Sequence, residues 1–141
     1  MRYFALDPEV AGGLGPKSIL DTSRHPPVVK RLHYEFQGWL GDEIVTSFPC
    51  MLVTERLAAA LEAADLSGLR FDDVLVTKDP QFEMFFPDTA VALPRWRWLC
   101  PDGAPGASDL WQDELAHLIV SERALSVLSK FQIDNCGVEE R

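Results

Sequence analysis

A six-residue pattern occurs twice in this chain, and it constrains the fold more than any other feature. Met51–Arg56 (MLVTER) matches Leu118–Arg123 (LIVSER), 67 residues further along, from position 51 to position 118. Three apolar residues favour a strand, the hydroxyl residue that follows favours a helix N-cap, and the glutamate favours the first helical turn. The chain is therefore expected to contain two strand-to-helix junctions and to fold as a mixture of helices and strands.

Each junction is followed by a helical pattern and then by a β-like run, at Phe71–Thr77 and at Ile133–Glu139. The first helix is expected to end near Gly68, and the second is expected to carry Lys130 in its last turn. The chain thus allows two similar β-α-β units. The alternative is that the match only reflects what many strand-to-helix junctions look like. The apolar stripes of the two helices are Leu57, Ala60, Leu61 and Ala64, and Ala124, Leu125, Leu128 and Phe131.

Shorter elements complete the expected architecture. Asp79 and Pro80 favour a short helix over 80–86, and Pro94–Trp98 alternates like a half-buried strand. The predicted fold class is α+β, with two main helices on a twisted, mostly antiparallel or mixed sheet, in one domain spanning 1–141. The remaining predictions are strands over 2–6, 28–36, 44–53 (broken at Pro49) and 93–99, with loops over 8–27 and 101–109.

The cysteine and histidine positions predict neither a metal site nor a cofactor. Cys50, Cys100 and Cys136 are far apart and form no C-x-x-C pair, so reduced thiols in a cytoplasmic protein are expected. The three histidines, at 25, 33 and 117, lack ligand spacing. In a hydrolytic or small-ligand-binding domain, Cys50 would be the nucleophile and His33 the base, but nothing in the surrounding sequence supports that pairing.

The charge distribution favours one class of partner and disfavours two others. The net charge is −9, and residues 42–141 hold eighteen acidic residues against eight basic ones. Such a surface repels phosphate backbones and anionic lipid headgroups, so nucleic-acid and membrane binding are not expected. No stretch of the sequence approaches the 18 apolar residues of a membrane-spanning helix. A basic protein partner is expected instead, although the acidity can also serve solubility alone.

Two tryptophans lie beside acidic residues, as in many binding hot spots, where an aromatic anchor is ringed by polar groups. Trp39 precedes the first acidic pair, and Trp111 lies between an aspartate and the second pair. The alternatives are that the tryptophans belong to the core and that the carboxylates are solvated edges. The residues predicted to bind a partner are Trp39, Asp42, Glu43, Asp109, Trp111, Asp113 and Glu114.

The segments Asp109–Trp111, Leu118–Ala124 and Leu66–Phe71, with a closing strand at the C-terminal end, suggest a family. This pattern resembles small bacterial immunity proteins of polymorphic toxin systems and related families of unknown function. The resemblance covers about the last two-thirds of the chain, and the first forty residues match nothing in it. It implies a cytoplasmic, non-enzymatic protein that binds and occludes a cognate toxin, with no catalytic residues.

The function predicted from the sequence is therefore a non-enzymatic protein-binding module, of the immunity type. The alternatives are an accessory or structural domain of unknown role, and a small-ligand-binding or hydrolytic domain that uses Cys50 and His33. No catalytic residue, metal or cofactor is predicted, and the oligomeric state is left open.

Overall fold

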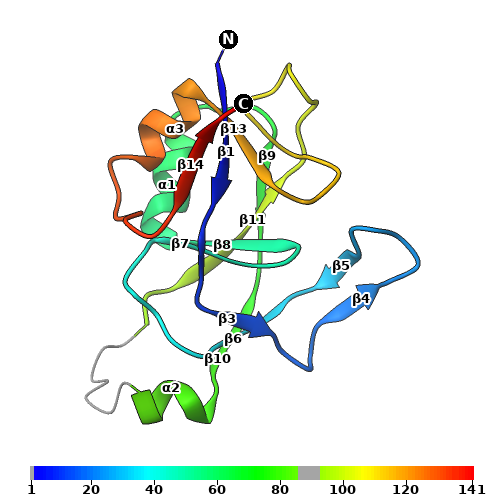
Figure 1. Cartoon of the computed structure of the whole chain (residues 1–141), viewed down its shortest axis with the longest axis vertical. Coiled ribbons are helices and arrows are strands. Elements are labelled where there is room, and N and C mark those ends of the chain that lie inside the picture. The colour runs from blue at the N-terminus through cyan, green and yellow to red at the C-terminus, as the bar shows by residue number, and fades with distance from the viewer. Residues whose placement is uncertain (1, 86–92) are drawn as a thin grey trace.

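The computed structural model describes residues 2–85 and 93–141, and this part of the chain holds far more strand than helix (Figure 1). The helices are α1 (Glu55–Ala63), α2 (Pro80–Phe85) and α3 (Glu122–Leu128). Because α2 is short, α1 and α3 are the two main helices, and the predicted α+β fold class is confirmed. The strands are β1 (Tyr3–Asp7), β2 (Glu9–Val10), β3 (Gly12–Leu14), β4 (Ile19–Asp21), β5 (Val28–Arg31), β6 (His33–Phe36), β7 (Ile44–Ser47), β8 (Cys50–Thr54), β9 (Leu69–Asp72), β10 (Leu75–Lys78), β11 (Trp96–Pro101), β12 (Leu110–Gln112), β13 (Leu118–Ser121) and β14 (Gly137–Glu140).

The strands form two larger and two smaller sheets. The larger ones have the strand orders β12-β13-β1-β14 and β2-β7-β8-β11-β9, and α1 and α3 lie together on one side of them (Figure 1). A three-stranded sheet, β10-β6-β3, mixes parallel and antiparallel pairs. The β4–β5 hairpin pairs only with itself and projects from the side opposite the two main helices (Figure 1).

The two helices begin where the sequence predicts. Thr54 and Ser121 both adopt extended backbone conformations, and their hydroxyls accept hydrogen bonds from the backbone N–H three residues later. The distances are 3.3 Å from Leu57 N to Thr54 Oγ1 and 3.1 Å from Ala124 N to Ser121 Oγ. Each hydroxyl satisfies a backbone donor that the first turn of a helix leaves free, which explains why each strand passes directly into a helix.

The two junctions belong to two units with the same strand order and the same register. In the first unit, β8 pairs with β11, so that Met51 lies opposite Leu99 and Thr54 opposite Trp96. In the second unit, β13 pairs with β1 in the matching way. The outer strands follow the same rule, because β9 pairs with β11 as β14 pairs with β1. The spatial order β7-β8-β11-β9 is thus repeated as β12-β13-β1-β14.

Along the chain, the two units exchange their central strands. The first run of elements is β1, then β7, β8, α1 and β9; the second is β11, β12, β13, α3 and β14. Yet β1 lies in the sheet of the second run, and β11 lies in the sheet of the first. The sequence predicts two similar β-α-β units, whereas each unit is a hairpin, a helix and an outer strand, completed by a strand from the other run.

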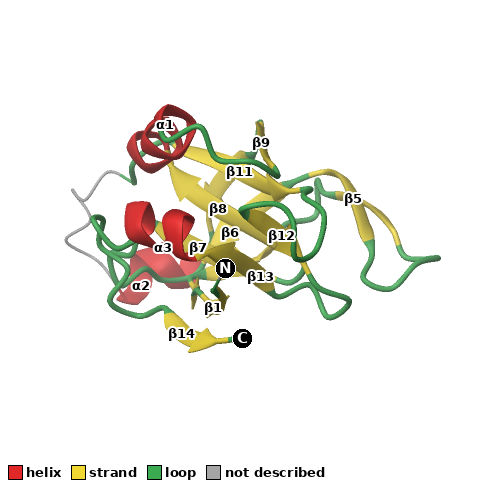
Figure 2. Ribbon diagram, turned by 90° about the horizontal axis from the view of Figure 1, so that it is seen from above, coloured by secondary structure: helices red, strands yellow, loops and turns green. Residues whose placement is uncertain are grey.

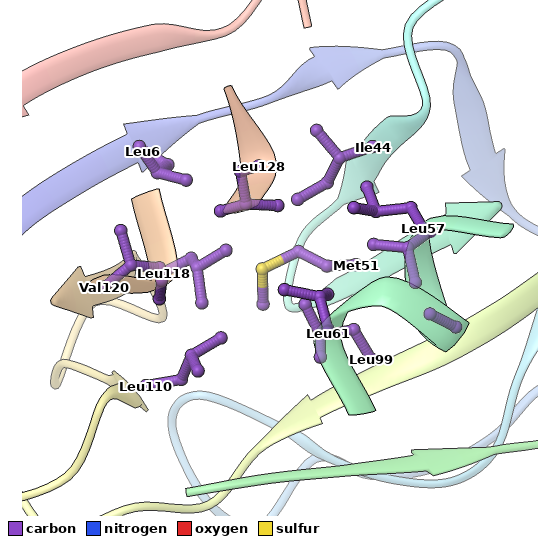
Figure 3. Packing of buried hydrophobic residues seen from close by; sticks show 13 residues of the cluster. Leu6, Ile44, Met51, Leu57, Leu61, Leu99, Leu110, Leu118, Val120 and Leu128 are labelled. Carbon is purple, nitrogen blue, oxygen red and sulfur yellow. The ribbon is translucent and has the colours of Figure 1, made fainter. Parts of the chain in front are cut away.

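The main core lies between the two units and follows their pseudo-symmetry (Figure 3). Most of its members occur in equivalent pairs, one from each unit. Both members of each pair are buried, so the two units contribute equally to the core. Each unit therefore needs the other to shield its apolar face from water. The pairs are Ile44 with Leu110, Met51 with Leu118, Val53 with Val120, Leu57 with Ala124, Leu61 with Leu128, and Leu99 with Leu6.

A second cluster covers the other face of the first unit only. It joins Val45, Leu52 and Trp96 of that unit to Leu32, Tyr34 and Phe36 and their neighbours. The Tyr34 hydroxyl lies in this layer and donates to the Thr46 carbonyl oxygen at 2.9 Å, and burial raises its pKa. The counterparts in the second unit, Tyr3, Trp111 and Ile119, belong to no second cluster among the described residues.

Several local predictions are wrong. The segment 8–27, expected to be a loop, contains β2, β3 and β4, and the strand expected over 28–36 is divided into β5 and β6. Within this segment Val28 is 42% exposed, whereas Leu32 is buried. Helix α3 ends at Leu128, so neither Lys130 nor Phe131 lies in it. The prediction for 80–86 is met by α2 through residue 85, and residue 86 lies outside the described residues.

Candidate functional site

The first junction places a buried carboxylate beneath the start of α1. Glu43 precedes β7, the partner strand of β8, and its side chain accepts a 3.0 Å hydrogen bond from the Thr54 hydroxyl. Arg56 Nη2 donates to Glu43 Oε2 at 2.7 Å, and the Gln132 N–H donates to the same oxygen at 3.2 Å. The hydrogen bond from Arg56 holds the pKa of Glu43 below its usual value and outweighs the effect of burial.

The second junction repeats this arrangement with an aspartate. Asp109 precedes β12, and it accepts a 2.6 Å hydrogen bond from the Ser121 hydroxyl and a 3.3 Å hydrogen bond from Arg123 Nη2. The Ser67 N–H donates to Asp109 at 3.0 Å. Burial alone would raise the pKa of Asp109, but the hydrogen bonds from Ser121, Ser67 and Arg123 outweigh it and lower the pKa.

Both carboxylates therefore connect the two units. Glu43 belongs to the first unit but binds Gln132, which follows α3, whereas Asp109 belongs to the second unit and binds Ser67, which follows α1. Both side chains are nearly buried, at 10% and 12% exposed. A buried carboxylate with this many donors is a structural group. Glu43 and Asp109, which the sequence predicts to bind a partner, already accept several hydrogen bonds within the fold.

Asp42 was expected in an acidic surface pair, and the structure corrects this expectation. It is fully buried, and its carboxylate accepts a 2.8 Å hydrogen bond from the Asn135 N–H and a 3.1 Å hydrogen bond from the Asn135 side-chain amide. The indole N–H of Trp39 donates to the Asp42 carbonyl oxygen at 2.8 Å. Trp39 is half-buried, and its ring meets that of Trp96 edge-on at 5.7 Å. Asp42 is thus not part of an exposed patch.

The second predicted pair, Asp113 and Glu114, is divided between interior and surface. The Asp113 side chain is 5% exposed and accepts hydrogen bonds from Arg141 Nη1 at 2.7 Å and from the His117 N–H at 2.9 Å. Burial would raise the pKa of Asp113, but these hydrogen bonds outweigh it and hold the pKa at about 2. Glu114 is exposed. Trp111 is 8% exposed, and its ring meets that of Tyr3 edge-on at 4.5 Å.

Cys50 and His33 do not form a nucleophile and base pair. Both ring nitrogens of His33 are engaged, because Nδ1 accepts from the Lys17 N–H at 3.2 Å and Nε2 lies 2.7 Å from the Thr77 hydroxyl. Cys50 is buried, and burial raises the pKa of its thiol to about 12, which disfavours the reactive thiolate. Within residues 2–85 and 93–141, no cluster of three or more His, Cys, Asp or Glu side chains could hold a metal ion.

The two hairpin turns of the repeated units lie beside each other and carry exposed apolar side chains. Phe48 is in the β7–β8 turn and is 51% exposed, and Leu115 is in the β12–β13 turn and is 58% exposed. The Gln112 side-chain amide donates to the Pro49 carbonyl oxygen at 2.9 Å and thereby ties the turns together. Val10, 69% exposed, lines the same hollow of about 220 Å³ as Phe48 and Leu115.

Acidic residues lie at the margin of this apolar surface. Asp7 is exposed and lines the same hollow, and Glu114 is exposed and adjoins Leu115 in sequence. We call Val10, Phe48, Leu115, Asp7 and Glu114 the tip face. Clustered large apolar side chains with a polar margin are typical of protein-binding surfaces.

Sequence reasoning identifies only one member of the tip face, Glu114. Phe48 and Leu115 lie in the two turns that end the repeated hairpins, so the offset of the two junctions could have identified them as a related pair. Nothing in the local sequence brings Val10 to them, because its position depends on the pairing of β2 with β7.

No protein-family model matches the chain, and no curated protein matches it significantly. In the part of the chain that the structure describes, no helix is both long and apolar enough to cross a membrane.

Proposed function

We propose that the protein is a non-enzymatic binding module that uses the tip face to bind a basic protein partner. The observation that carries this proposal is the exposure of Val10, Phe48 and Leu115 around one hollow, at the point where the two repeated hairpins meet. Exposed apolar side chains of this size are costly to hydrate, and their burial against a partner would stabilise a complex.

The charge distribution supports a basic partner. The chain carries a net charge of −9, Asp7 lines the hollow with the apolar side chains, and Glu114 adjoins Leu115 in sequence. Carboxylates at the margin of an interface accelerate association with a positively charged protein and change its affinity less. The acidic surface is therefore suited to bring a basic partner to the tip face.

The immunity-type role follows from the sequence resemblance. A protein of this type binds a cognate toxin and occludes its active surface, and many such surfaces are basic where the toxin acts on nucleic acid. The tip face would then lie against the toxin. A role as an accessory domain without a tight partner is the alternative, and the experiment below distinguishes the two.

The test is calorimetry with the product of the adjacent gene, at two salt concentrations, for the natural sequence and for the variants Phe48→Ser and Leu115→Ser. We expect tight binding that weakens with salt, and a loss of about thirtyfold for each variant, as for an interface hot spot. The matched control is Leu40→Ser, because Leu40 is 65% exposed but does not line the tip hollow.

Two results would reject the proposal. Absence of binding to the adjacent gene product would favour the accessory role. Equal losses for Leu115→Ser and Leu40→Ser would show that the partner binds elsewhere.

In a separate kinetic experiment, Asp7→Asn with Glu114→Gln should slow association at low salt and leave the dissociation rate nearly unchanged.

A further inference from the structure

The outer edge of β14 is open. β14 is the last strand in the order β12-β13-β1-β14 and lies at the margin of the molecule (Figure 2). The Arg141 N–H donates to the Tyr3 carbonyl oxygen at 2.9 Å. The backbone N–H and C=O groups of Arg141, Glu139 and Gly137 therefore point towards β1. Because these directions alternate along an antiparallel pair, the N–H and C=O groups of Val138 and Glu140 point away from the sheet. In residues 2–85 and 93–141, no backbone group pairs with them.

The side chains along this edge are exposed and acidic. All four residues of β14 are exposed, and Val138 is 47% exposed. Glu140 is paired with Arg2 at 2.7 Å, whereas Glu139 has no ion-pair partner in the described part of the chain. A hollow of about 590 Å³ lies along the strand, and Asp7 and His117 line both this hollow and the one at the tip face.

The equivalent edge in the first unit differs from β14 in charge and in packing. It is β9, where the Asp102 N–H donates to the Gly68 carbonyl oxygen and Phe71 occupies the position of Val138. Phe71 is partly buried against the main core, whereas Val138 is 47% exposed. Arg70 lies 3.9 Å from Asp72 and 3.6 Å from the Asp102 carboxylate, so the charges of β9 are compensated locally.

We propose that the partner adds an extended basic segment to the open edge of β14, continuing the four-stranded sheet by one strand. This inference rests on the proposed function, because it names the part of the partner that binds beside the tip face. The outward N–H and C=O groups of Val138 and Glu140 would supply backbone hydrogen bonds. Glu139 and Asp7 would select lysine or arginine side chains on the added strand.

The position of the edge supports a single continuous interface. The hollow beside β14 and the hollow at the tip face share Leu6, Asp7 and His117, so a segment bound at β14 would lie next to the tip face. Strand addition supplies affinity that depends little on sequence, while the apolar tip face and the acidic edge supply specificity.

The first test uses synthetic peptides and residue-resolved amide hydrogen exchange of the whole chain. The probe is a ten-residue peptide that alternates lysine and valine, and the comparison peptide alternates glutamate and valine. We expect the lysine peptide to slow exchange of the Val138 and Glu140 amides at least about tenfold more than the glutamate peptide does. Methylation of alternate peptide nitrogens should abolish this protection. Equal protection of the Leu69 and Phe71 amides, or none at β14, would overturn the proposal.

A second test changes the protein. Val138→Pro removes an outward N–H and leaves the backbone groups that pair with β1, since proline is tolerated on the open side of an edge strand. We expect this variant to bind the lysine peptide about tenfold more weakly, and the matched control Val138→Ala to bind within about threefold of the natural sequence. Equal binding by the two variants would contradict strand addition.

The adjacent gene product separates this inference from the proposed function. If it binds and the Phe48 and Leu115 variants weaken it, but the amides of Val138 and Glu140 exchange at unchanged rates, the function stands and the strand addition fails. If it does not bind, yet the lysine peptide protects β14, the open edge takes basic strands and the assigned partner is wrong.

Discussion

The two units share a scaffold but differ in what covers them. In both, a carboxylate before the hairpin binds the cap hydroxyl and the arginine at the start of the helix, and the core pairs lie between the units. The first unit buries its other face under the layer that contains Tyr34 and Phe36. The second unit carries the exposed strand β14 beside the tip face. The repeated carboxylates and core pairs serve folding. We propose that the exposed pair Phe48 and Leu115 and the unmatched edge of β14 serve binding.

The largest expected effect tests the equivalence of the two halves of the core. Leu61 and Leu128 are equivalent, and both are fully buried. Leu61→Ala and Leu128→Ala should each lower the free energy of unfolding by about 3 kcal/mol, because each leaves a cavity in the same shared core. Denaturant unfolding monitored by tryptophan fluorescence measures both. A loss at Leu128 of less than half the loss at Leu61 would show that the units contribute unequally.

A smaller effect tests the two junction carboxylates. Glu43→Gln and Asp109→Asn should each lower the free energy of unfolding by about 2 kcal/mol, since each change leaves donors from both units without a charged acceptor. The control is Arg56→Ala, which should cost less than about 1 kcal/mol because the Arg56 side chain is 71% exposed. If the control costs as much as Glu43→Gln, the ion pair and not the buried acceptor stabilises the junction.

The smallest expected effect is a pH dependence of stability that only the turn of the second unit should show. Asp113 has a folded-state pKa of about 2, below its ordinary 3.8, so the stability it contributes is present above about pH 4 and is lost as the pH falls towards 2. Ser47 lies before the turn of the first unit and cannot titrate. Asp113→Asn should therefore remove about 1 kcal/mol at pH 6 and nearly nothing at pH 2. If the loss in the free energy of unfolding is the same at pH 2 and pH 6, the substitution acts through packing and not through the charge of Asp113.

The junctions could be predicted because their physics is local. A cap hydroxyl and the turn that follows it are neighbours in sequence, so Thr54 and Ser121 could be identified directly. The offset of the two junctions also indicated a repeat, and the structure shows matching registers on both sides of it. The exchange of β1 and β11 could not be predicted, because it depends on which distant strand completes each sheet.

The acidic residues show where sequence reasoning fails. The sequence predicts surface positions for Asp42, Glu43 and Asp113. Burial of a carboxylate is costly unless hydrogen-bond donors from other parts of the chain contact it. Those donors come from Asn135, Gln132 and Arg141, which are distant in sequence. Charge alone therefore does not locate the surface that we propose for binding.

The exchanged strands also decide how the molecule can be divided. If the chain is cut between β9 and β11, the N-terminal fragment keeps β1, which completes the sheet of the other fragment, and loses β11, which completes its own. Each fragment then lacks the central strand of its own sheet. Reassembly requires each fragment to insert its strand, β1 or β11, into the sheet of the other. A polypeptide with a single copy of the unit would need to form an intertwined dimer, because only a second copy could supply the central strand that pairs with its hairpin and its outer strand.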